Sequence, residues 1–257
     1  MYEKLDENKI VLTIEQLELR IQERFPKASL AGVAKELLGI ASVTIRRTAT
    51  LREPNLPLRV GVGLLLCGGV LVLALMAPEA RLNYQIRAIT ELVQTLEALL
   101  GSLFFLGTGV AFLVPLESRL KRKVALALVH QLRALAHIVD MHQLTKDPSE
   151  LTARGPSTPS SPKRTMTDFE LMRYLNYCTE LLALVSKVGA LTVQGYTDPV
   201  VLNAVDEVEN LTTALSQKIW QKITLLETEL DEKDESEARD AARRRSLLLG
   251  RRFPRAR

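Results

Sequence analysis

The stretch that decides the fold is VGVGLLLCGGVLVLALMAP at residues 60–78, nineteen consecutive uncharged residues between Arg59 and Glu79. At about 1.5 Å per residue, a helix of this length covers roughly 28 Å, close to the roughly 30 Å hydrocarbon core of a bilayer. A second uncharged run of nineteen, ALLGSLFFLGTGVAFLVPL, occupies residues 98–116. Buried helices of water-soluble proteins are usually shorter and carry a polar face. The two runs therefore predict a two-helix transmembrane hairpin.

The cations around these runs predict the orientation of the hairpin. Its outer ends are flanked by Arg46, Arg47, Arg52, Arg59, Arg119, Lys121, Arg122 and Lys123. The segment between the runs holds only Arg81 and Arg87. Segments rich in Lys and Arg stay on the cytoplasmic side, so we expect both termini in the cytoplasm. A reporter at residue 90 should then be outside and one at residue 257 inside.

Hydrophobic periodicity and proline positions divide the whole chain into helices and connections. We expect an N-terminal cytosolic helical hairpin at 1–50, a proline-containing linker at 51–59, the first transmembrane helix at 60–78, an external amphipathic helix at 79–97, the second transmembrane helix at 98–116, a cytosolic helix at 117–148, a flexible Ser/Pro-rich linker at 149–165, an antiparallel pair of cytosolic helices at 166–230, and an acidic, then arginine-rich, tail at 231–257. The segment at 79–97 could lie on the outer membrane surface, extend the second span or pair with its copy in a dimer. The fold class is an all-α membrane protein, a transmembrane hairpin with a cytosolic helical bundle.

Capping signals mark several helix ends. Thr13 and Thr167, each with Gln or Glu three residues later, fit capping boxes, and Ser29 and Asp198 fit N-caps. After Asp198 the apolar stripe consists of Val201, Val205, Val208, Leu215, Ile219, Ile223, Leu226 and Leu230. We expect Trp220, beside this stripe, in the core or at the bundle edge, with a binding hot spot as the alternative.

The tail carries the excess positive charge of the chain. From Ala241 onward there are seven arginines and no acid, whereas the net charge of the whole chain is +4. With the tail in the cytoplasm, we expect anionic lipid headgroups as a partner of Arg243, Arg244, Arg245, Arg251 and Arg252. The alternative is an exposed, frayed end. A nucleic-acid partner is not expected, because interleaved aromatics and a known binding module are missing.

The three histidines, His130, His137 and His142, fall within thirteen residues. On one helix His130 and His137 are roughly 10 Å apart, too far to share an ion. His137 and Asp140, at i and i+3, are the best metal candidates, but two ligands make a poor site. We therefore expect no metal and no other cofactor, with His130 and His137 forming hydrogen bonds across the bundle.

Motifs for catalysis are missing from the sequence. It has no phosphate-binding loop, no zinc-protease helix motif and no G-x-S-x-G nucleophile motif. We expect a non-enzymatic scaffold or regulator in the membrane that docks a cytosolic or membrane protein through its cytosolic helices. One alternative is an oligomeric channel or transport accessory subunit, a homo-oligomer lined by Ser102 and Thr108. Another is a metal-dependent membrane enzyme using His137 and Asp140. The short spans and the lack of an organelle signal favour a bacterial cytoplasmic membrane.

Overall fold

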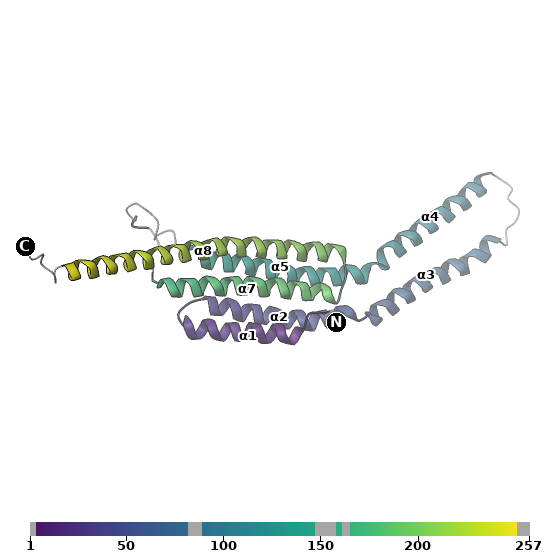
Figure 1. Ribbon diagram of the computed structural model, residues 1–257. Helices are drawn as coiled ribbons and strands as arrows, with labels where there is room; N and C mark the ends of the chain where they lie inside the picture. Colours follow the sequence, from purple (N-terminus) through teal and green to yellow (C-terminus); the bar gives the residue numbers. More distant parts are fainter. Residues whose placement is uncertain (1–3, 82–88, 147–157, 161–164, 251–257) are drawn as a thin grey trace, which may run out of the picture.

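The computed structural model describes residues 4–81, 89–146, 158–160 and 165–250, and all regular secondary structure in these ranges is α-helical. The helices are α1 (Glu7–Arg24), α2 (Leu30–Arg52), α3 (Leu56–Arg81), α4 (Ile89–Leu113), α5 (Leu116–Leu144), α7 (Asp168–Gln194) and α8 (Pro199–Gly250). Figure 1 shows an elongated molecule in which α3 and α4 project from one end. The all-helical fold class is thus confirmed.

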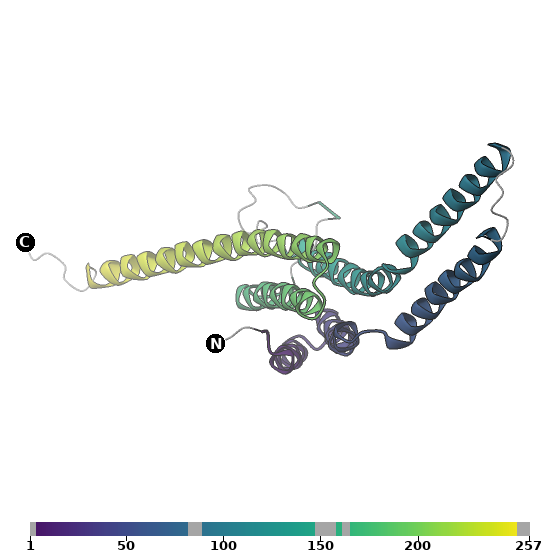
Figure 2. The same ribbon diagram turned by 90° about the vertical axis from the view of Figure 1, so that its right-hand side faces the viewer.

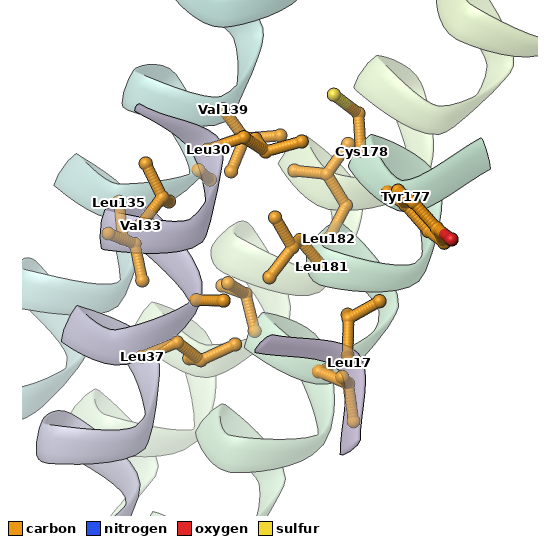
Figure 3. Close-up of a cluster of buried hydrophobic side chains, with 14 of the residues drawn as sticks. Leu17, Leu30, Val33, Leu37, Leu135, Val139, Tyr177, Cys178, Leu181 and Leu182 are labelled. Carbon is orange, nitrogen blue, oxygen red and sulfur yellow. The ribbon is translucent and has the colours of Figure 1, made fainter. Parts of the chain in front are cut away.

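A helical bundle of α1, α2, α5, α7 and α8 forms the body of the molecule (Figures 1 and 2). The central helix is α7, which contacts each of the other four. Leu181 and Leu182 of α7 are fully buried. Figure 3 shows them among side chains from α1, α2 and α5, including Leu17, Val33 and Leu135. Burial of these apolar side chains is the main favourable term for the bundle.

The predicted apolar stripe of α8 is confirmed. Its members Val201, Val205, Val208, Leu215, Ile219, Ile223 and Leu226 are all buried. Leu230 is partly buried against the same core. Spacings of three and four residues place these side chains on one face of the helix, which is the face that meets the bundle.

The hairpin helices α3 and α4 have the character of membrane spans. Among the described residues, two helical stretches, Leu30–Leu71 and Leu96–Leu144, are long and apolar enough to cross a membrane, and the most apolar part of each is buried nowhere inside the molecule. Large apolar side chains such as Leu64 and Phe105 are exposed. In addition, α4 begins at Ile89, so the described part of the predicted external helix that follows residue 88 continues directly into the second span. Residues 82–88 of that predicted helix lie outside the described residues.

Of the four predicted caps, two are confirmed as side-chain caps, and Ser29 stands at the N-cap position of α2 without a capping hydrogen bond from its side chain. Thr167 and Glu170 form the capping box of α7, and Asp198 Oδ1 accepts hydrogen bonds from two backbone N–H groups at the start of α8. The box at Thr13 is wrong: α1 begins at Glu7, and Thr13 Oγ1 donates to the Lys9 carbonyl within it. The reason is that Asp6 caps the helix earlier, through its carboxylate.

The predicted tail is helical over most of its length. Helix α8 continues through residues 231–250 and extends past the end of the bundle (Figure 1). Ala, Glu, Lys and Arg dominate this stretch and are strong helix formers. Arg239 and Glu235 add an i,i+4 ion pair at 2.6 Å. Residues 251–257 lie outside the described residues, as does the predicted linker at 149–165 apart from 158–160 and 165.

Helix α2 carries two buried polar side chains. In the part of the chain that the structure describes, the hydroxyls of Thr44 and Thr48 are buried and have no hydrogen-bond partner. We expect Thr44→Val to raise the free energy of unfolding by about 1 kcal/mol, because valine keeps the shape and removes the unsatisfied group. The melting temperature should rise by roughly 2–4 °C. The matched control Thr50→Val, on the exposed side of α2, should change it little, and a fall with Thr44→Val would show that the Thr44 hydroxyl does have a partner.

Candidate functional site at the base of the hairpin

Glu117 lies in the first turn of α5 and links it to the start of α3. Its Oε2 accepts a hydrogen bond from Arg59 Nε at 2.6 Å, and its Oε1 accepts one from the Asn55 backbone N–H at 3.0 Å. The Lys121 ammonium lies 2.9 Å from Oε1. One carboxylate therefore holds together the points where the two hairpin helices meet the bundle. We call Asn55, Arg59, Glu117 and Lys121 the clasp.

The clasp also reaches the end of α2. Lys121 Nζ donates to the carbonyl of Glu53, the residue that follows α2, at 2.7 Å. The Glu117 side chain is only 14% exposed. Hydrogen bonds from Arg59, then from the Asn55 N–H and Lys121, lower the pKa of Glu117 from 4.5 to about 2. Glu117 is therefore a firmly ionised carboxylate between two cations.

A second polar cluster joins the α7–α8 turn to the start of α5. Arg122 donates to Asp198 Oδ2 through Nε at 3.0 Å and Nη2 at 2.9 Å. The Tyr196 hydroxyl donates to the Ser118 carbonyl at 2.9 Å. Burial raises the pKa of Asp198, but the hydrogen bonds from Arg122 and from the first N–H groups of α8 outweigh it, so the pKa lies below its usual range. Burial, and then the nearby Asp198 charge, raise the pKa of Tyr196.

The same end of the bundle is closed by contacts from the N-terminal segment and α2. The Leu5 backbone N–H donates to Gln194 Oε1 at 2.9 Å, and Arg52 lies 3.5 Å from Glu7. Gly195, after α7, approaches α2 so closely that a Cβ atom there would lie 2.6 Å from Thr48 Cγ2. Only glycine fits this contact without a shift of α2 or the turn. The ends of several bundle helices thus converge on the base of the hairpin.

The predicted metal candidates are not assembled into a site. His130 and His137 lie on the exposed outer face of α5, and neither bonds to another helix within the described residues. The prediction that they form hydrogen bonds across the bundle is therefore wrong, because the buried face of α5 is made by aliphatic residues and Gln143 instead. Asp140 Oδ1 accepts a hydrogen bond from Gln143 Nε2 at 2.7 Å. The described residues contain no group of three or more His, Cys, Asp or Glu side chains that could hold a metal ion.

Trp220 and the cysteines lie in contrasting surroundings. Trp220 is 62% exposed on the outer face of α8, so its placement in the core is wrong. It sits one position past the buried Ile219, which turns its ring away from the bundle. Cys178 is buried in α7, where burial raises the pKa of its thiol to about 12, and Cys67 is exposed on α3. Both are free.

The predicted headgroup contacts lie far from the hairpin. Arg243, Arg244 and Arg245 belong to the last part of α8, at the end of the molecule opposite α3 and α4 (Figure 1). Arg251 and Arg252 lie outside the described residues. Contact of these arginines with anionic headgroups stays a prediction, and a membrane crossed by the hairpin would not meet this end of α8 in the conformation shown.

Sequence reasoning missed the clasp, although one signal was present. Glu117 is the single acid in a stretch that holds Arg119, Lys121, Arg122 and Lys123. A lone carboxylate among cations next to a predicted span points to an ion pair. Its main partner, Arg59, is 58 positions away and was counted only for orientation.

Comparisons with protein-family models, with curated proteins and with solved structures found no match to this chain. The geometry described above is therefore the basis for a functional proposal.

Acid should weaken the clasp in a way that depends on Glu117. Because its folded-state pKa of about 2 lies below the ordinary 4.5, its contribution to stability is complete above pH 4.5 and is lost as the pH falls towards 2. We expect the difference in melting temperature between the native protein and Glu117→Gln to shrink over this interval. The control Glu15→Gln, on the exposed face of α1, should show no such change. A difference that is constant from pH 6 to 2.5 would contradict the ionised clasp.

Proposed function

We propose that this is a two-pass membrane protein whose cytoplasmic helical bundle acts as a non-enzymatic scaffold or regulator, mechanically coupled to its membrane hairpin. The observation that supports the proposal is the clasp, in which Glu117 joins the starts of α3 and α5. Both legs of the hairpin lead directly into the bundle. Helix α2 is followed by α3 after three residues, and α4 is followed by α5 after two.

The connection between α4 and α5 is a tight turn. Val114 N donates to the Val110 carbonyl and Arg119 N to the Pro115 carbonyl, each at 3.0 Å. Pro115 lacks the N–H that a continuous helix would use, which explains the break. A flexible tether would let the bundle and the hairpin move independently. Short connections held by ion pairs favour coupled movement.

The cations at the base support a cytoplasmic bundle. Arg59, Lys121 and Arg122 take part in the clasp or the neighbouring cluster, and Arg119 lies over the Phe112 ring at 5.3 Å. Positively charged residues at the end of a span remain on the cytoplasmic side. A reporter fused at residue 90 is expected to be active outside and one at residue 257 inside. The reverse pattern would refute this orientation.

The coupling can be tested with spin labels on the two legs. Val60 and Val114 are exposed, so Val60→Cys and Val114→Cys in a Cys67→Ser chain accept labels near the base, while buried Cys178 stays unlabelled. We expect one narrow distance distribution in lipid and a broader one after Glu117→Lys, because two cations would then face Arg59. Glu15→Lys, on α1, is the matched control. An unchanged distribution in Glu117→Lys would count against coupling through the clasp.

A second candidate function is an oligomeric channel. In the described residues, a Cβ added at Gly61, Gly63, Gly101, Gly107 or Gly109 would meet no atom within 4 Å, so these helix faces are open to other hairpins. The Ser102 hydroxyl donates to the Ala98 carbonyl of its own helix, and Thr108 is exposed. Ion flux through vesicles that contain the purified protein would support the channel, and a strict monomer in lipid would exclude it.

A further inference from the structure

A cavity of about 680 Å³ opens at the end of the bundle farthest from the hairpin. It lies between the α1–α2 turn, the end of α5 and the start of α7, at the end of the bundle opposite α3 and α4 in Figure 1. Its volume falls within the range of about 300–1,000 Å³ that is typical of small-molecule sites. The site so far described, at the base of the hairpin, does not include any residue of this cavity.

The cavity lining is cationic. Arg24, Lys27 and Lys146 contribute positive charge, whereas Glu170 is the acid in the lining. The Glu170 carboxylate already accepts hydrogen bonds from the Thr167 N–H and hydroxyl in the capping box of α7. Lys27 is exposed, and Lys146 lies over the Tyr174 ring at 5.9 Å. An anion entering the cavity would therefore meet an excess of positive charge.

Ser29 and His142 form a side-chain pair in the lining of the same cavity. Ser29 Oγ lies 2.8 Å from His142 Nε2, and His142 Nδ1 lies 2.8 Å from the Ile138 carbonyl. A carbonyl oxygen only accepts, so Nδ1 carries a hydrogen and Nε2 is left to pair with the serine. Ser29 occupies the N-cap position of α2, but its side chain makes no capping hydrogen bond. The hydroxyl that would ordinarily cap α2 is turned to the histidine instead, and the first N–H groups of α2 are not capped by it.

Most of the remaining lining, apart from Thr145 and Thr165, is apolar or aromatic. Phe25, Pro26, Met141, Met166 and Tyr174 contribute to it. A ligand that fills this space has an anionic group and an apolar or ring-shaped body. Phosphate is an anion that matches lysines together with a serine and a histidine. The distance from the hairpin favours a water-soluble compound over a lipid headgroup.

We propose that this cavity binds a small organic phosphate, with the phosphate between Lys27, Lys146 and the Ser29–His142 pair and the organic part against Met141 and Tyr174. Such a ligand would compete with Ser29 for His142 Nε2 by donating a P–OH hydrogen to it, and its other phosphate oxygens would accept hydrogen bonds from the Lys27 and Lys146 ammonium groups. The Ser29–His142 pair is a direct link between the start of α2 and the end of α5.

This position gives the ligand a route to the hairpin. Helix α2 begins at the cavity and ends at the clasp, and α5 begins at the clasp and ends at the cavity. At about 1.5 Å per residue, α2 spans roughly 35 Å. A ligand that binds better when Ser29 and His142 are apart shifts the relative position of these two helices. This regulatory step rests on the proposed function, whereas ligand binding does not.

The test measures binding to the full-length protein in lipid nanodiscs, using AMP, glucose 6-phosphate, inorganic phosphate and adenosine as probes. AMP or glucose 6-phosphate is expected to bind with one site per chain, more tightly than inorganic phosphate, and adenosine is expected not to bind. Lys27→Glu should weaken binding about tenfold or more, as expected for loss of a charge-assisted contact. The matched control is Lys35→Glu, an exposed lysine on α2 outside the cavity, which should leave the affinity unchanged.

Other variants keep the test decisive. Lys27 is exposed, so Lys27→Glu should leave the melting temperature unchanged, and Lys146→Ala should weaken binding several-fold. The proposal fails if neither organic phosphate binds at millimolar concentration, if Lys27→Glu and Lys35→Glu act alike, or if inorganic phosphate binds as tightly as the organic phosphates. Binding that also shifts the distance between labels at residues 60 and 114 supports both proposals. Binding without that shift supports the cavity as a ligand site and counts against the proposed function alone.

Discussion

A chain in which residues 56–115 are replaced by about six Gly and Ser residues is expected to move completely from the membrane fraction to the soluble fraction while the bundle stays folded. The buried core is built by α1, α2, α5, α7 and α8, and no described residue of α3 or α4 belongs to it. The large exposed apolar surface that is suited to a bilayer lies in the hairpin, for example at Leu64, Leu71 and Phe104. Without this apolar surface, the shortened chain is not expected to insert into a bilayer.

The ends left by this excision are close enough to join. The Asn55 N–H lies 3.0 Å from Glu117 Oε1, so a short flexible linker spans the gap without pulling α2 away from α5. Carbonate extraction of membranes reports the partition, and circular dichroism with a thermal melt reports the fold. Insertion of the same linker between Asn55 and Leu56, with the hairpin retained, is the control and should remain in the membrane. A shortened chain that still sediments with membranes would show that another part of the protein holds it there.

The excised protein would also isolate the contribution of the clasp. It keeps Lys121 and Glu117 but loses Arg59, whose hydrogen bond is the main cause of the low pKa of Glu117. The carboxylate should then titrate closer to its ordinary range, since one cation and its hydrogen bond are gone. The hairpin and the bundle thus influence each other at this residue. The two parts are coupled in this sense: any change that favours one arrangement of α3 and α4 must also alter the contacts of the clasp.

The parts of the fold that the sequence predicts are those set by local patterns. The two apolar runs, the stripe on α8 and the Thr167 capping box depend on residues within one helix or one turn, and each is found in the structure. The start of α1 was misplaced because Asp6 and Thr13 are both good caps, and the pattern alone did not rank them. Capping patterns predict more than one helix start where two good capping residues lie one or two turns apart.

The candidate sites depend on contacts between distant residues. Glu117 and Arg59 are 58 positions apart, and Ser29 and His142 are 113 apart. Ser29 was predicted as a helix cap from its neighbours, whereas its actual partner depends on how α5 packs against α2. The histidine cluster drew attention because its members are close in sequence, yet only His142 among them has a described hydrogen-bond partner. Nearness along a helix does not by itself bring side chains into contact with one another or with a second helix.

The largest loss of stability is expected from Leu181→Ala. Leu181 has no exposed surface and lies in the middle of α7, the helix around which the others pack (Figure 3). Truncation leaves a cavity that close-packed neighbours fill only in part, so the free energy of unfolding should fall by about 2–5 kcal/mol. This is a large share of the roughly 5–15 kcal/mol typical of a folded domain.

Urea unfolding of the excised, water-soluble chain measures this effect without a bilayer, and Leu19→Ala provides the matched control. Leu19 is 56% exposed on α1, so its truncation should change the free energy of unfolding by less than about 0.5 kcal/mol. The same substitution at two leucines thus separates the effect of burial from the effect of residue type.

If Leu181→Ala and Leu19→Ala lower the free energy of unfolding equally, α7 is not the centre of the bundle. If Leu181→Ala is far more costly and membrane partition of the full-length protein is unchanged, the bundle and the hairpin are independent in stability. Their coupling must then operate through the ionic contacts at Glu117 and not through a shared core.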